Sequence, residues 1–157
     1  MPPDALLRTH SVADHDAARC RLHATCVEIG GTGVLLLGPS GSGKSDLALR
    51  LIDAGAGLVA DDQVLVEKRG GRLLGRAADQ LAGLVEVRGI GILRLPHRAW
   101  SALGLAVELA PGETLPRLPD PRNHALLGIE LPLIRLDPRA PSACAKVRLA
   151  LSAERVA

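Results

Sequence analysis

The alternation of hydrophobic and polar residues predicts a chain built mainly from strands. Four stretches combine short apolar runs with glycine or proline, which is the pattern of strands bounded by turns. The first holds two strands around a glycine turn at residues 30–33, and the second turns at Gly70 and Gly71. The stretches are residues 23–38, 57–75, 81–95, which Gly89 and Gly91 interrupt, and 126–138, which Pro132 and Pro138 limit.

Two other stretches have the helical period of apolar residues. In the first a glycine marks the end of the helix, and in the second a proline lies near the start. These are residues 44–55, where Leu47 and Leu51 repeat at i, i+4 before Gly55, and residues 140–157, where Cys144, Val147 and Leu151 share a face after Pro141.

The length and composition of the chain predict a single domain. The chain has 157 residues, 47% of them hydrophobic, but no Phe, no Tyr and a single Trp, so aliphatic side chains must fill the core. Residues 1–20 are polar and aperiodic, and we expect a mobile lead-in before one catalytic domain at residues 21–157. The segment Asp14-His15-Asp16 together with His10 could suggest a metal site, but a solvated tail is the preferred interpretation.

Charge and apolar runs argue against several classes of partner. The formal net charge is +2 with both signs mixed along the chain, and aromatic residues for base stacking are nearly absent, so we expect no nucleic acid partner. No apolar run approaches the roughly 18 residues of a membrane span, and the first residues do not resemble a secretory signal. The three cysteines lack a paired spacing and are interpreted as free thiols of a cytoplasmic protein.

The stretch GPSGSGKS after the apolar run 34–37 matches the phosphate-loop pattern in full. Glycines let successive backbone N–H groups surround phosphate oxygens, and the helix that follows directs its positive end at them. A lysine then reaches the outer phosphates and a hydroxyl ligates Mg²⁺. We therefore predict that a nucleotide or polyphosphate binds with Mg²⁺ to Gly38, Pro39, Ser40, Gly41, Ser42, Gly43, Lys44 and Ser45.

Two adjacent aspartates, Asp61 and Asp62, end the predicted strand that begins near Leu58. Neighbours on a regular strand point to opposite faces, so only one would face the phosphates unless the strand has already ended. The pair could divide labour, one carboxylate holding metal and the other accepting a proton from a hydroxyl. The loop and this pair alone fit a GTPase, a small-molecule kinase or an unusual protein kinase.

Glu86 and Arg88 lie two residues apart and therefore share a strand face. Such a pair is usually a solvated ion pair. Beside a phosphate loop it could instead supply a metal ligand and a charge that stabilises phosphoryl transfer.

The run from His23 to about Leu95 resembles the catalytic domain of bacterial HPr kinase/phosphorylase. The resemblance rests on HATCVEIGGTGVLLLGPSGSGKSDLAL, GAGLVADDQV and VEVRGIGIL, and on their order and spacing. The segment from Glu86 to Ile92 matches the family signature of an acid, an apolar residue, Arg-Gly, an apolar residue, Gly and Ile. About half of the chain takes part in the resemblance.

The resemblance implies a fold and a reaction. The fold is α/β, a phosphate-loop kinase domain like phosphoenolpyruvate carboxykinase, with a mixed sheet and flanking helices. The reaction is phosphorylation by ATP of a serine on HPr, a phosphocarrier of the sugar phosphotransferase system. The same site removes that phosphate with inorganic phosphate and releases pyrophosphate. Many members are homohexamers, so a homo-oligomer is implied.

The resemblance also assigns roles to residues. Asp62 is similar to the catalytic aspartate, a general base in phosphorylation and a general acid in the reverse reaction, with Asp61 as its neighbour. Lys44 resembles the phosphate-loop lysine. Further catalytic positions are His23, Arg88 and, less closely matched, Arg117, for which Arg122 and Arg135 compete. The Mg²⁺ ligands would be Ser45 and Glu86.

The chain also departs from the family. Only about twenty residues precede His23, so we expect the family's N-terminal domain to be absent, as in the short forms of some Gram-negative bacteria. Residues 131–146 resemble only loosely the family loop tied to dephosphorylation. The alternatives are a small-molecule kinase on the same scaffold, which would need a dedicated substrate pocket, and a non-catalytic nucleotide sensor.

Overall fold

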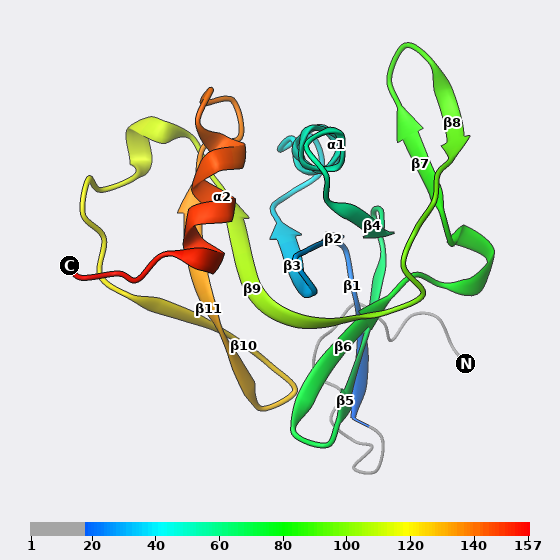
Figure 1. Ribbon diagram of the computed structural model, residues 1–157, viewed down its shortest axis with the longest axis horizontal. Helices are drawn as coiled ribbons and strands as arrows, with labels where there is room; N and C mark the ends of the chain where they lie inside the picture. Colours follow the sequence, from blue (N-terminus) through cyan, green and yellow to red (C-terminus); the bar gives the residue numbers. More distant parts are fainter. Residues whose placement is uncertain (1–17) are drawn as a thin grey trace.

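The computed structural model describes residues 18–157 (Figure 1). The expected lead-in lies outside the described residues except for its last three, and so do His10, Asp14 and Asp16. In chain order the elements are β1 (Arg19–Leu22), β2 (Thr25–Ile29), β3 (Thr32–Leu37), α1 (Lys44–Asp53), β4 (Gly57–Ala60), β5 (Val64–Arg69), β6 (Arg72–Arg76), η2 (Asp79–Leu81), β7 (Leu84–Val87), β8 (Gly91–Arg94), β9 (Ser101–Leu109), η3 (Gly112–Thr114), β10 (Arg122–Leu126), β11 (Ile129–Leu136) and α2 (Ala143–Ser152).

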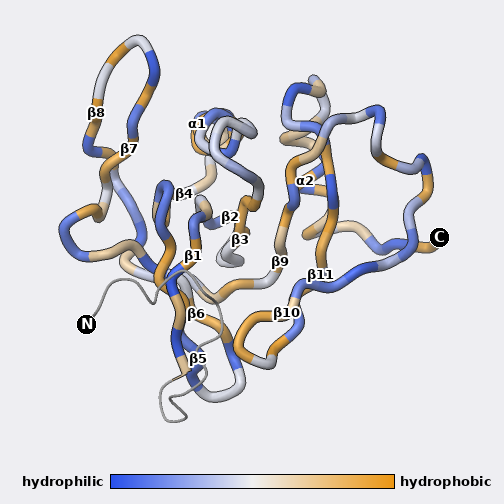
Figure 2. Tube along the Cα trace, turned by 180° about the vertical axis from the view of Figure 1, so that it is seen from behind, coloured by the Kyte–Doolittle hydropathy of each residue, from blue (hydrophilic) through white to orange (hydrophobic). Residues whose placement is uncertain are grey.

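Strand β9 organises a mixed sheet of nine strands. One edge of β9 pairs in parallel with β3, while its other edge pairs first with β6 and then, in parallel, with β11. Beyond β3 the sheet continues with β2 and β4, and beyond β6 with β5 and β1. The β7–β8 hairpin forms a separate two-stranded sheet and stands apart from the large one in both views (Figures 1 and 2).

The sheet is buried on both faces, which explains the unbroken apolar sequence of β3. Val34 and Leu36 pack with α1 and α2 on one face, whereas Leu35 packs on the other face against strands of the β5–β6 and β10–β11 hairpins. Figure 2 shows the hydrophobic colour along β3. Both helices therefore flank the same face of the sheet, and folded-over strands cover the opposite face.

Most predicted elements are confirmed, with three differences. The predicted strand stretch at 81–95 is a hairpin, and β1 begins at Arg19, two residues before the expected domain boundary. Pro132 does not limit a strand but lies inside β11, where it pairs with Asn123. Because β9 pairs with β11 only from Leu133 onward, Pro132 lies on a free edge that needs no N–H.

Strand β9 itself was not among the predicted elements, and a local irregularity explains why. The pairing with β3 shifts between Gly33 and Val34, which face Leu103 and Leu105. Leu103 consequently packs on one face of the sheet and Leu105 on the other, although they are two residues apart. This bulge breaks the period of two on which a sequence-based assignment depends.

A substitution at Gly104 tests the bulge. A Cβ at Gly104 would lie 2.6 Å from Cγ2 of Thr32, so we expect Gly104→Ala to lower the free energy of unfolding by about 1–3 kcal/mol in urea denaturation. Thr32→Ser removes that methyl group, and the double variant should recover most of the loss. Equal stability of the wild type and Gly104→Ala would contradict the packing described here.

Candidate functional site

The phosphate loop connects the end of β3 to the first turn of α1, in the middle of the sheet. Gly43 precedes the helix with a φ of 101°, a left-handed conformation that favours glycine. A Cβ there would also lie 3.2 Å from Cγ of Pro138, in the segment between β11 and α2. Glycine at this position thus allows both the turn into the helix and the close contact with Pro138.

Lys44 is held inside the loop rather than extended into solvent. Its side chain is 6% exposed, and Nζ donates to the carbonyl oxygens of Gly38 at 2.7 Å and Pro39 at 3.1 Å. Burial lowers the pKa of Lys44, while the nearby charges of Asp62 and Asp61 act in the opposite direction. A lysine with its charge desolvated in this way gains from an anion in the loop.

Ser42 is the second polar group that fits a phosphate. Its Oγ is buried and has no hydrogen-bond partner among the described residues. Buried hydroxyl groups are normally satisfied, and one inside a phosphate loop is placed to donate to a bound oxygen. Together with Lys44 and the start of α1, Ser42 makes the loop suitable for a polyphosphate.

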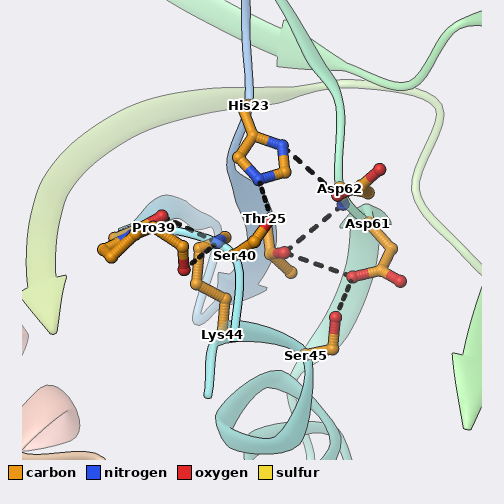
Figure 3. Close-up of polar contacts among 9 residues, drawn as sticks. His23, Thr25, Pro39, Ser40, Lys44, Ser45, Asp61 and Asp62 are labelled. Atoms are coloured by element: carbon orange, nitrogen blue, oxygen red, sulfur yellow. Dashed lines mark hydrogen bonds and ion pairs between the residues drawn. The ribbon is translucent and has the colours of Figure 1, made fainter. Parts of the chain in front are cut away.

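Asp61 connects three elements through one oxygen atom (Figure 3). Its Oδ1 accepts hydrogen bonds from Ser45 Oγ at 2.7 Å, at the start of α1, and from Thr25 Oγ1 at 3.2 Å, in β2. A hydroxyl beside a carboxylate at this position is the usual protein contribution to Mg²⁺ in phosphate-loop enzymes. Ser45 and Asp61 therefore fit the metal, and phosphates and water would complete its shell.

Asp62 turns away from Asp61 and faces His23. Its φ is 70°, an uncommon conformation outside glycine that ends the strand and lets the two carboxylates diverge. Asp62 Oδ1 lies 3.3 Å from His23 Nδ1, and the Asp62 side chain is 66% exposed. The other ring nitrogen, Nε2, lies 3.3 Å from Oγ of Ser40 in the loop. One carboxylate thus faces the helix start, and the other faces a histidine and solvent.

Thr25 was not found by sequence analysis, although it contacts both aspartates. It is fully buried, and its Oγ1 donates to Asp61 Oδ1 and accepts from the backbone N–H of Asp62 at 3.4 Å. The hydroxyl therefore fixes the turn that separates the two carboxylates. The available signal was a threonine two residues after His23, which places both on the same face of the chain.

Glu86 and Arg88 lie on the β7–β8 hairpin, exposed to solvent. Strand β7 contacts α1, but within residues 18–157 the structure records no hydrogen bond or ion pair from Glu86 or Arg88 to the phosphate loop. The chain that leaves the hairpin is fixed to the large sheet, since Arg98 Nε donates to Glu28 at 2.8 Å and Arg98 N donates to Leu58 O at 2.8 Å. Of the two predicted metal ligands, Ser45 lies in contact with Asp61. The role of Glu86 as the other ligand stays a prediction.

The three candidate arginines of the second half lie in different places. Arg117 is exposed in the connection between η3 and β10, and Arg122 is exposed at the start of β10. Arg135 forms an ion pair: its Nε lies 3.3 Å from Oε1 of Glu108, and Glu108 pairs in register with Leu37, the residue before the loop. Which of the three arginines serves the site therefore stays a prediction.

A cavity of about 590 Å³ lies next to the phosphate loop. It is lined by ends of β1, β3 and β9 and by the β10–β11 hairpin, and His23 and Glu108 belong to its wall. Sequence analysis did not detect it, because four separate segments of the chain form it.

Residues 18–157 contain neither a clustered set of metal ligands nor a helix that could span a membrane. No group of three or more His, Cys, Asp or Glu side chains among residues 18–157 is arranged to hold a metal ion. Neither helix in that part of the chain has the length and hydrophobicity to span a membrane.

Comparison with known proteins identifies relatives of this site. The model of the "HPr Serine kinase C-terminal domain" family matches residues 14–98, which include His23, the loop, both aspartates and Glu86. The HPr kinase/phosphorylase of Clostridium beijerinckii is 45% identical over 82 residues, 52% of this chain and 27% of that protein. The HPr kinase/phosphorylase of Geobacter sulfurreducens is 36% identical over 130 residues, 75% of this chain and 41% of that protein.

A solved structure extends the likeness beyond the family match. The Hpr(Ser) kinase/phosphatase from Coxiella burnetii superposes with a TM-score of 0.74 and 29% sequence identity, over 83% of this chain and 87% of that one. The mixed sheet with few helices is therefore shared. The chain nevertheless spans less than half the length of the curated relatives described above.

Removing the hydroxyl of Thr25 tests its role in placing the aspartates. We expect Thr25→Val, which keeps the shape, to reduce the gain in ATP affinity that Mg²⁺ provides by about tenfold in calorimetric titrations. Thr25→Ser keeps the hydroxyl and should behave like the wild type. If Val and Ser at this position bind Mg²⁺–ATP equally well, Thr25 serves packing alone.

Proposed function

Because the chain belongs to the family of the HPr serine kinase C-terminal domain, we propose that it is an ATP-dependent protein kinase that phosphorylates a serine of HPr. HPr is the phosphocarrier protein of the sugar phosphotransferase system. The observation that carries the proposal is the separation of the two aspartates: Asp61 contacts Ser45, and Asp62 contacts His23 while remaining accessible. A kinase needs one carboxylate for metal and a second for the acceptor hydroxyl.

The loop and α1 bind and orient the triphosphate in this proposal. Backbone N–H groups, Ser42 and Lys44 donate to phosphate oxygens, and Lys44 leaves the carbonyls of Gly38 and Pro39 to do so. Ser45 and Asp61 would hold Mg²⁺, which when bound supplies positive charge against the outer phosphates. Thr25 keeps Asp61 aligned for this task.

Asp62 acts on the acceptor. Its carboxylate takes the proton from the serine hydroxyl as the oxygen bonds to the γ-phosphorus, while the bond from that phosphorus to the β–γ bridging oxygen breaks and ADP leaves. His23 contacts the same carboxylate and fixes its orientation through Nδ1. In the reverse direction a protonated Asp62 returns the proton to the serine as inorganic phosphate takes the phosphoryl group and becomes pyrophosphate.

Finer features of the proposal rest on the family. They are phosphorolysis, assembly into a homo-oligomer, a cytoplasmic location and a fold of the phosphoenolpyruvate carboxykinase type. Glu86 and Arg88 would join the site from the β7–β8 hairpin. The further catalytic arginine would be Arg135 rather than Arg117, because Arg135 contacts Glu108.

A small-molecule kinase is the second candidate, because a cavity of about 590 Å³ beside His23 has the size of an ordinary ligand pocket. A non-catalytic nucleotide sensor is less well supported, since Lys44, Ser45, Asp61 and Asp62 are all present and Ser45 is hydrogen-bonded to Asp61.

The direct test is incubation of the protein with γ-labelled ATP, Mg²⁺ and HPr from the same organism, followed by location of the label. We expect label on one HPr serine, and none on HPr in which that serine is alanine. Adding inorganic phosphate to the labelled product should release labelled pyrophosphate if phosphorolysis is retained. Absence of label on HPr, despite tight ATP binding, would contradict the proposed acceptor.

Asp62→Asn separates chemistry from binding. An amide cannot accept the proton, so we expect transfer to HPr to fall by a factor of about 10²–10⁴ with unchanged ATP affinity. Asp53→Asn, at an exposed carboxylate at the end of α1, is the matched control and should leave both quantities unchanged. Transfer by Asp62→Asn at the wild-type rate would remove Asp62 from the role of base.

A further inference from the structure

We propose that the cavity beside His23 is an acceptor subsite that receives an apolar side chain adjacent to the phosphorylated serine of the partner protein. The inference rests on the proposed kinase function and specifies how that site selects its substrate.

The cavity lies at the carboxyl ends of two neighbouring parallel strands, β3 and β9, where ligands bind in open sheets of this kind. Leu37 and Leu109 contribute from these strand ends. The β10–β11 hairpin forms a second side with Ala125 and Leu133, and the end of β1 contributes Leu22.

His23 connects the cavity to the proposed catalytic base. Its ring lines the cavity, while its Nδ1 lies 3.3 Å from the carboxylate of Asp62. A ligand in the cavity therefore touches the residue that contacts the proposed base. An acceptor serine at Asp62 would have its sequence neighbours within reach of the cavity, which distinguishes the cavity from a remote effector site.

The nucleoside of ATP is not expected in this cavity. Gly38 and Pro39, whose carbonyls hold Lys44, line it. The lysine of a phosphate loop reaches the outer phosphates, so the cavity adjoins the end of ATP that carries the transferred phosphate. The nucleoside extends from the opposite end of the triphosphate.

The lining selects an apolar group rather than a polar metabolite. Leucine and alanine side chains form most of it, and the ionisable or polar members are His23, His124 and Glu108. Glu108 already faces Arg135 at 3.3 Å. A hydroxyl-rich small molecule would leave many of its groups without hydrogen bonds here, which is costly, whereas an aliphatic side chain gains from burial. This favours the protein acceptor over the small-molecule kinase.

Filling the cavity tests the proposal. Ala125 in β10 lines the cavity and is exposed to solvent. A large side chain can therefore be placed there without replacing a core residue. We expect Ala125→Trp to raise the KM for HPr by about ten- to a hundredfold, the value of one buried aliphatic side chain, with ATP affinity unchanged. Ala150→Trp, at an exposed position of α2 outside the cavity, is the matched control and should leave the KM unchanged.

A scan of HPr identifies the occupant. Residues within two positions of the phosphorylated serine are changed one at a time to Asp and assayed with the wild-type enzyme and with Ala125→Trp. We expect one position to raise the KM strongly with the wild type and little with the variant, because the subsite is already blocked.

The outcomes separate the two proposals. No label on HPr with the wild-type enzyme overturns the kinase function and this inference with it. Label on HPr with equal KM for the wild type and Ala125→Trp overturns the inference alone. A phosphorylated small molecule whose turnover Ala125→Trp abolishes, while HPr turnover stays unchanged, assigns the cavity to a metabolite instead.

Discussion

The hydrogen bond from Ser45 to Asp61 is the constraint on which the rest of the site depends. It joins the first turn of α1 to the end of β4, and Thr25 extends the connection to β2. Asp61 is thereby committed to the helix side, and the left-handed turn at Asp62 sends the second carboxylate toward His23. Adjacent residues can have separate roles only because the strand ends between them.

Strand β9 is the element on which the arrangement of the sheet depends. It pairs with β3 on one edge and with both β6 and β11 on the other, so it unites the segment matched by the family model with the segment that follows. It also brings Glu108 next to Leu37, one residue before the phosphate loop. The wall of the cavity and the contact with Arg135 both depend on that register.

The local parts of this structure could be predicted from the sequence. The phosphate loop, α1, the hairpin at Gly70 and Gly71 and the apolar face of α2 each have a signal within a few residues. Strand β9 was missed because the bulge at Gly104 reverses the side-chain alternation. Its role as the centre of the sheet is a consequence of long-range pairing, which leaves no local pattern.

The sequence names the phosphate loop and the two aspartates, but their arrangement follows only from the fold. Sequence analysis could state that Asp61 and Asp62 divide labour, but the assignment depends on the φ of Asp62 and on the buried hydroxyl of Thr25, which no motif reports. The cavity could not be predicted for a similar reason. Its lining residues His23, Glu108, His124 and Leu133 come together only after four segments of the chain have folded.

The most direct test of the central claim is electron paramagnetic resonance of Mn²⁺ in place of Mg²⁺, measured with ATP on the wild type, Asp61→Asn and Asp62→Asn. If Asp61 serves the metal and Asp62 the acceptor, Asp61→Asn loses the bound Mn²⁺ signal and Asp62→Asn retains it. Loss of the signal in Asp62→Asn, with retention in Asp61→Asn, would contradict the division of labour.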